Sequence, residues 1–145
     1  MGLSKIKLGL IEYLELGNLD SKRDWGYAGD YVEAMYLMLQ NDKPDNYVIS
    51  TGETFSVKDF INTSCNELRI DIDWQGSGID ETAVDKKTGK SIIRINPKYY
   101  RPTEVDLLLG NSTKAEKMLK WKPKTNFYEL VSKMIEYDFN KLKNK

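Results

Sequence analysis

One stretch of the chain limits its possible folds more than any other. Residues 22–40 read KRDWGYAGDYVEAMYLMLQ, so an arginine and an aspartate precede a glycine-containing turn and a helix. The pattern predicts a helix over residues 31–39 that is apolar on most of its circumference, with Asp30 and Glu33 as its capping pair. Such a helix is buried on several sides in its complete protein. The fold must therefore offer this helix an apolar surface.

A second apolar run predicts a strand that is covered on both faces, as in a parallel sheet. Residues 46–52 read NYVISTG, a continuous apolar run that ends in glycine. The chain otherwise alternates helices and strands and has no long linker, which predicts an α/β fold and a single unit over residues 1–145. The other expected elements are helices over 3–11, 57–68 (capped by Ser56 and Asp59), 111–121 and 127–135 (capped by Asn126 and Glu129), strands over 14–16, 70–74 and 91–96, and a polar loop or hairpin over 76–90.

Composition excludes several classes of function. Basic and acidic residues number 22 each, so the formal net charge is zero, which argues against a nucleic-acid or anionic-membrane partner. We expect no membrane span and no signal peptide, and therefore a cytoplasmic location. The chain has no histidine, and Cys65 is its one cysteine, which excludes an internal disulfide, a Cys-based metal site and the common histidine bases. We expect Cys65 to be a buried structural thiol and assign no metal-binding residue.

Two arginine-containing segments each follow an expected strand, and both carry the planar guanidinium fork that matches phosphate oxygens. The carboxylate of Glu104 can accept two hydrogen bonds, which suits the adjacent hydroxyls of a ribose. Arg23, Arg101 and Glu104 would together suit a nucleoside diphosphate. In the alternative, Arg23 pairs with Asp24 or with a backbone carbonyl, while Arg101 and Glu104 lie on the surface. The two segments are LGNLDSKRDWG (16–26) and NPKYYRPTEVD (96–106).

One spacing suggests proton-transfer chemistry. Tyr137 and Lys141 match the Tyr-x-x-x-Lys pattern, but the same spacing is that of an i,i+4 pair on a solvent-facing helix surface near the chain end. We interpret the pair as a surface feature and assign no catalytic residue to this chain.

Four stretches cover nearly the whole chain with a specific pattern: LGNLDSKRDWGYAGDYVEAMYLMLQ, YVISTGETFSVKDF, YYRPTEVDLLLGNSTKAEKMLKWKPKT and FYELVSKMIEYD. Together they resemble the C-terminal part of the GDP-mannose 4,6-dehydratase family, in the extended short-chain dehydrogenase/reductase group. Tyr27 departs from the family, which often has histidine there. The resemblance implies a substrate-binding lobe plus the last strand and helices of a Rossmann-type domain, with the N-terminal nucleotide-binding half absent.

The resemblance also implies a reaction, a cofactor and a site. Family members convert GDP-mannose to GDP-4-dehydro-6-deoxy-mannose and water, with NADP bound by the N-terminal half. By resemblance, Arg23 and Arg101 would contact the diphosphate, Glu104 would contact the ribose, and Gly17 would border the nucleotide. The expected partners are GDP-mannose, the missing Rossmann half and, in the complete enzyme, further copies of itself. We expect the isolated chain to be inactive. In the alternative, the chain is a non-catalytic module with a GDP-sugar-binding or regulatory role.

Overall fold

The computed structural model describes residues 1–103, 105 and 107–144 of the chain. Its helices are α1 (Gly2–Lys7), α2 (Ala28–Leu39), α3 (Val57–Glu67), α4 (Thr113–Leu119) and α5 (Phe127–Lys143), with a 3₁₀ helix η1 (Gly78–Asp80). Its strands are β1 (Leu14–Leu16), β2 (Lys22–Arg23), β3 (Phe55–Ser56), β4 (Ile72–Gln75), β5 (Thr82–Asp85), β6 (Ser91–Ile95) and β7 (Leu107–Leu108). The expected α/β class is confirmed.

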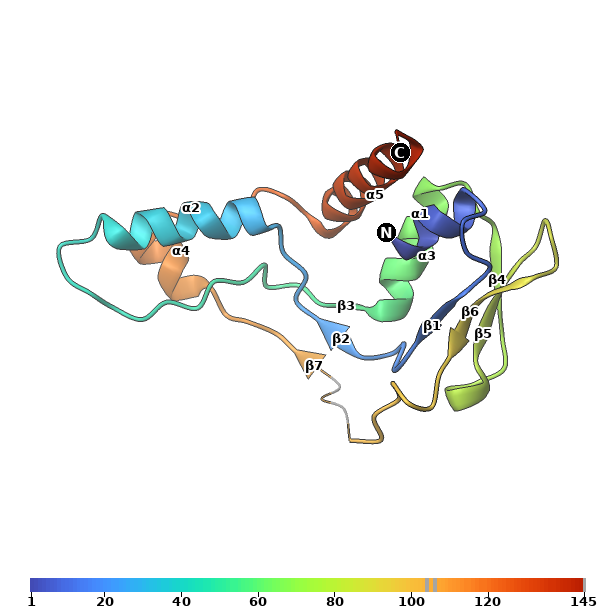
Figure 1. Cartoon of the computed structure of the whole chain (residues 1–145). Helices are drawn as coiled ribbons and strands as arrows, with labels where there is room; N and C mark the ends of the chain where they lie inside the picture. The colour runs from blue at the N-terminus through green and yellow to red at the C-terminus, as the bar shows by residue number, and fades with distance from the viewer. Residues whose placement is uncertain (104, 106, 145) are drawn as a thin grey trace.

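A four-stranded sheet carries the larger hydrophobic core. Its order is β1-β6-β5-β4, with β1 parallel to β6 and the other two pairs antiparallel. In Figure 1, α1, α3 and α5 lie together at the same end of the molecule as this sheet. These elements bury apolar side chains jointly, which is the main stabilising contribution to such a layer. The most deeply buried members of the core are Cys65, Ala83, Ile93 and Val131.

A smaller core lies at the opposite end of the molecule, where α2 and α4 pack together (Figure 1). Trp121 is its largest buried side chain, and Ala34 and Ala115 let the two helices approach closely. Between the two ends is a three-stranded sheet in the order β3-β2-β7, with β2 antiparallel to β3 and parallel to β7. Strand β2 is therefore central to the connection between the two cores.

Two of the three expected helix caps are confirmed. Ser56 with Asp59 and Asn126 with Glu129 form reciprocal capping boxes at the starts of α3 and α5. The third expectation, that Asp30 and Glu33 cap a helix starting at Tyr31, is wrong, because α2 starts at Ala28.

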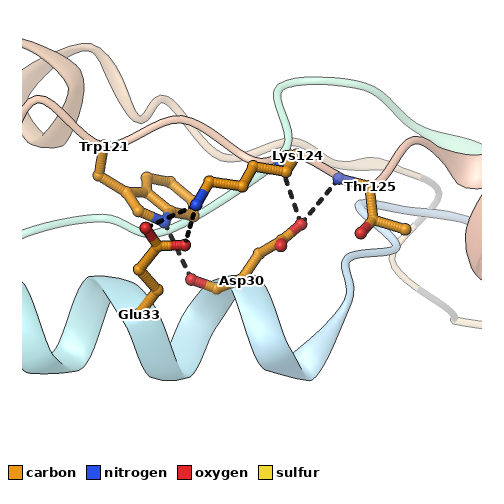
Figure 2. Close-up of polar contacts among 5 residues, drawn as sticks. All are labelled: Asp30, Glu33, Trp121, Lys124 and Thr125. Atoms are coloured by element: carbon orange, nitrogen blue, oxygen red, sulfur yellow. Dashed lines mark hydrogen bonds and ion pairs between the residues drawn. The ribbon is translucent and has the colours of Figure 1, made fainter.

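The carboxylate of Asp30 instead accepts hydrogen bonds from the backbone N–H groups of Lys124 and Thr125, at 3.0 and 2.9 Å. Its backbone carbonyl accepts the indole N–H of Trp121 at 2.9 Å, and the Lys124 ammonium bonds to both Glu33 oxygens (Figure 2). Asp30 thus anchors the connection between α4 and α5 to the start of α2, and α2 itself has no side-chain cap.

The expected strand over residues 46–52 is also wrong. The segment is extended but belongs to neither ladder of the described residues, because no neighbouring strand offers it backbone partners. Several boundaries also differ: α1 ends before Leu10 and Ile11, β4 covers Ile72–Gln75 instead of 70–74, and α5 continues past residue 135 to Lys143. The segment 76–90, expected as a polar loop or hairpin, contains η1 and β5, and β5 pairs with β4 and β6.

Candidate functional site

The parallel pair β1–β6 brings two expected site residues to one edge of the sheet. The backbone N–H of Asn96, just after β6, donates to the carbonyl of Leu16 at 2.9 Å. A Cβ atom on Gly17 would lie only 2.3 Å from the carbonyl oxygen of Tyr99. Glycine is therefore required at this position for the chain after β6 to approach the end of β1 so closely. In open α/β sheets, ligands bind outside such carboxyl ends of strands.

Asn18 fixes the position of Arg101. Its side-chain oxygen accepts the backbone N–H of Arg101, and its side-chain N–H group donates to the Arg101 carbonyl, both at 2.8 Å. The pair of bonds holds the backbone of residue 101 beside the end of β1, and the side chain of Arg101 is exposed. The structure thus places Gly17 and the backbone of Arg101 at the same edge of the sheet, while their roles in nucleotide binding stay predictions.

Arg23 is half-buried at the end of β2 and reaches the same loop from the other side. Its Nη1 donates to the carbonyls of Lys22 and Val105, at 2.8 and 2.7 Å. The bond to Val105 ties β2 to the segment that follows Arg101. A bond from Arg23 to a backbone carbonyl, which belonged to the alternative to a diphosphate contact, is therefore present. Glu104, the expected ribose ligand, lies outside the described residues.

A pocket of about 220 Å³ adjoins the paired Asn18 and Arg101 backbone. Two of its lining residues, Asp20 and Glu81, carry carboxyl groups, and Glu81 forms an ion pair with Lys58. Carboxylates repel an anion, so the pocket itself is unsuited to a diphosphate, which the arginines outside it would attract. The full lining is Asn18, Leu19, Asp20, Ser21, Gly78, Glu81, Ile95, Tyr100 and Pro102.

The described residues do not fit a dinucleotide cofactor or a metal ion. No connection from a strand to a helix in the described ranges carries the G-x-G-x-x-G loop that cradles a pyrophosphate. The same residues contain no group of histidine, cysteine or carboxylate side chains suited to hold a metal. None of the described helices combines the length and apolar character that a membrane crossing requires.

Tyrosine-based proton transfer has no support in the described part of the chain. Burial, followed by the charges of Asp24 and Asp30, raises the pKa of Tyr31, so even less of its basic phenolate form is present near neutral pH. Tyr137 is 64% exposed on α5, with the Lys141 ammonium 5.5 Å from its ring centroid. Their interpretation as a surface pair is confirmed.

Sequence reasoning missed two residues that shape the site. Asn18 follows Gly17 at a strand end, a place where a side-chain amide commonly bonds to nearby backbone, and that position was its only signal. Asp24 carried no signal beyond its charge next to Arg23. Its carboxylate accepts hydrogen bonds from Thr51 and Gly52, which come from a distant loop.

Known proteins resemble this chain over nearly its whole length. A family model described as GDP-mannose 4,6 dehydratase matches residues 1–134. A curated relative of that name from Drosophila melanogaster is 54% identical over 136 residues, which is 94% of this chain and 34% of the relative. The human relative is 52% identical over the same share of this chain and 37% of its own length. The chain therefore spans little more than a third of these relatives.

Solved structures show the same fold at low identity. RMD from Pseudomonas aeruginosa, complexed with NADPH, aligns with a TM-score of 0.75 and 16% identity over 96% of this chain and 40% of that protein. A UDP-glucose 4-epimerase from Thermotoga maritima, with UDP-glucose, aligns with a TM-score of 0.71 and 20% identity. This alignment covers 97% of this chain and 38% of the epimerase chain. The chain thus has the same fold as part of each of these two proteins. The match over residues 1–134 and the identity to curated relatives show that the chain belongs to the GDP-mannose 4,6-dehydratase family.

Proposed function

We propose that this chain is the GDP-sugar-binding part of an enzyme that dehydrates GDP-mannose to GDP-4-dehydro-6-deoxy-mannose. One observation carries the proposal: Asn18 and the Val105 carbonyl tie Arg101 and Arg23 to a single loop at the carboxyl edge of the β1–β6 pair. Two guanidinium groups at such an edge suit a diphosphate, whose oxygens they can bind in pairs. Glu104 remains our proposed ribose contact, and Gly17 our proposed border of the nucleotide.

The activity needs more than these residues. The redox step requires a nicotinamide cofactor, which we propose to be NADP, held by a Rossmann half that this chain must join. The role of the present chain is to bind and orient the GDP end of the substrate. We further propose that the complete enzyme is a homo-oligomer and that it is cytoplasmic. The single, buried and free thiol of Cys65 supports only the second part, since it suits a reducing compartment.

Arginine-to-lysine substitutions test the binding role. Lysine keeps the charge but loses the fork, so Arg23→Lys or Arg101→Lys should each weaken GDP binding to this chain by about 1.5–3 kcal/mol in calorimetric titration. Arg94→Lys is the matched control, because Arg94 is exposed on β6 and stacks on Tyr13 instead. Unchanged GDP affinity in both site variants would refute the assignment. If GDP bound normally but no Rossmann half ever restored turnover, the non-catalytic alternative would be favoured.

A further inference from the structure

Arg23, Asp24 and Trp25 are consecutive residues, and each is held by different contacts. Arg23 is paired in the sheet with Phe55 of β3 and Leu108 of β7. The carboxylate of Asp24 accepts the Thr51 N–H at 2.9 Å and the Thr51 hydroxyl at 2.6 Å through one oxygen. Its second oxygen accepts the Gly52 N–H at 3.0 Å, and the next residue, Trp25, donates its indole N–H to the Phe55 carbonyl at 3.0 Å. The backbone around Arg23 is therefore fixed on both sides.

The two opposite charges of Arg23 and Asp24 face different partners. Successive side chains in an extended chain point to opposite sides, and Arg23 is directed to the Val105 carbonyl while Asp24 is directed to the 51–52 loop. An Asp24 side chain that turned towards Arg23 would give up three hydrogen bonds, two of them from backbone N–H groups. That change would exchange the three hydrogen bonds for one ion pair near the surface, and such an ion pair contributes little to stability.

We propose that Asp24 is a positioning residue that keeps the Arg23 guanidinium directed to the Val105 carbonyl, close in sequence to Arg101. The proposal rests on the proposed function, since it concerns how the diphosphate contact is held in place. The Thr51 and Gly52 donors occupy the carboxylate, and this occupation keeps Asp24 from neutralising its neighbour. The 51–52 loop, which no sequence pattern connects with the site, thereby becomes part of the support of Arg23.

Asp24→Asn tests the proposal. Asparagine keeps one acceptor oxygen but places an NH₂ group where the second oxygen receives the Gly52 N–H. We expect the ratio of GDP affinity to guanosine affinity, measured by calorimetry on the full chain, to fall at least about tenfold. The direction is diagnostic: removing a negative charge beside a bound diphosphate would by electrostatics alone strengthen GDP binding. A merely structural role would weaken GDP and guanosine equally.

Asp59→Asn is the control for the change of carboxylate to amide. Asp59 also accepts a backbone N–H and a hydroxyl, both from Ser56, at the start of α3. This variant should leave the GDP-to-guanosine ratio unchanged. If Asp24→Asn does not fold, Thr51→Val still tests the proposal, because it removes only the hydroxyl donor. Thr51→Val should lower the ratio of GDP affinity to guanosine affinity. Thr51→Ser, which keeps the hydroxyl donor, should have the same ratio as the unsubstituted chain.

The outcomes separate this inference from the proposed function. If Arg23→Lys lowers the ratio but Asp24→Asn and Thr51→Val do not, the positioning role is overturned while the diphosphate contact stands. An Asp24→Asn variant that binds GDP more tightly overturns it as well, since the aspartate would then act only through its charge. If the unsubstituted chain binds GDP no better than guanosine, the proposed function itself fails, and the inference fails with it.

Discussion

Cys65 lies in the larger core, against the sheet, and only 1% of it is exposed. Burial, with a smaller contribution from the charge of Asp85, raises the pKa of its thiol to about 12. Because the thiolate is the reactive form, a thiol in this environment is inert. We expect no labelling of the folded chain by a thiol reagent near pH 9, the ordinary pKa of the group, and prompt labelling in urea.

The same shift predicts the sign of a pH effect. The pKa of the Cys65 thiol is higher in the folded chain than in the unfolded chain. The contribution of this thiol to the free energy of unfolding is therefore complete below the unfolded pKa, and it is lost as the pH rises towards the folded pKa. A Cys65→Ala variant should therefore lose less stability than the parent chain between these two pKa values. Labelling of the folded chain at the unfolded rate would contradict the buried placement.

At the scale of residues, sequence reasoning identified the two candidate arginines but missed the residues that hold their backbone in place. Arg23 and Arg101 stood out because the chemistry of a guanidinium is visible in its residue type. Asn18 and Asp24 act through bonds to backbone that is remote in sequence, and such partners are known only once the chain is folded. The roles of both arginines as diphosphate contacts stay predictions.

Helix starts show where local patterns suffice at the scale of elements. Ser56 and Asn126 were correctly predicted as caps, because each bonds to residues within its own first turn. The equally spaced Asp30 and Glu33 were misassigned, since the 121–125 connection offers Asp30 two backbone donors. The prediction of a strand over residues 46–52 was wrong for a related reason. A strand forms only beside another strand, and the sequence of the segment does not show whether a partner is present.

Asp30 and Glu33 provide a matched pair of substitutions on α2. Asp30→Ala leaves the N–H groups of Lys124 and Thr125 without their acceptor in a buried place, and we expect a loss of about 1–3 kcal/mol in the free energy of unfolding. Glu33→Ala removes only a solvent-exposed ion pair with Lys124, which should cost less than about 1 kcal/mol. Urea denaturation of both variants measures the difference, and equal losses would show that Asp30 does not anchor the helix.

At the scale of the whole molecule, the described residues form two cores of unequal completeness. The smaller core is closed on one side of α2 by Ala34 and Trp121, but the other side of α2 exposes a row of apolar side chains. This exposed face agrees with the prediction that α2 packs against a further apolar surface in its complete protein. The expectation that residues 1–145 act as a single unit stays a prediction. The exposed side chains on α2 are Val32, Met35, Tyr36 and Leu39.

This exposed face of α2 predicts self-association of the isolated chain. Contiguous apolar surface beyond about a few hundred Å² marks association or aggregation sites. Met35→Lys or Leu39→Lys should therefore reduce association in sedimentation velocity without lowering stability. Tyr137→Lys, which replaces a similarly exposed side chain on α5, should leave association unchanged. A parent chain that is already a monodisperse monomer with a high melting temperature would contradict this account.

The central claim is that this chain binds the GDP end of the substrate and depends on a Rossmann half for chemistry. The most direct test is a product assay for the 4-keto sugar with GDP-mannose and NADP. The assay is run on this chain, on the N-terminal half of a family relative, and on their mixture. We predict product only in the mixture, because the described residues offer neither a pyrophosphate-binding loop nor a credible base. Turnover by the 145-residue chain alone would contradict the account and return attention to Tyr137 and Lys141.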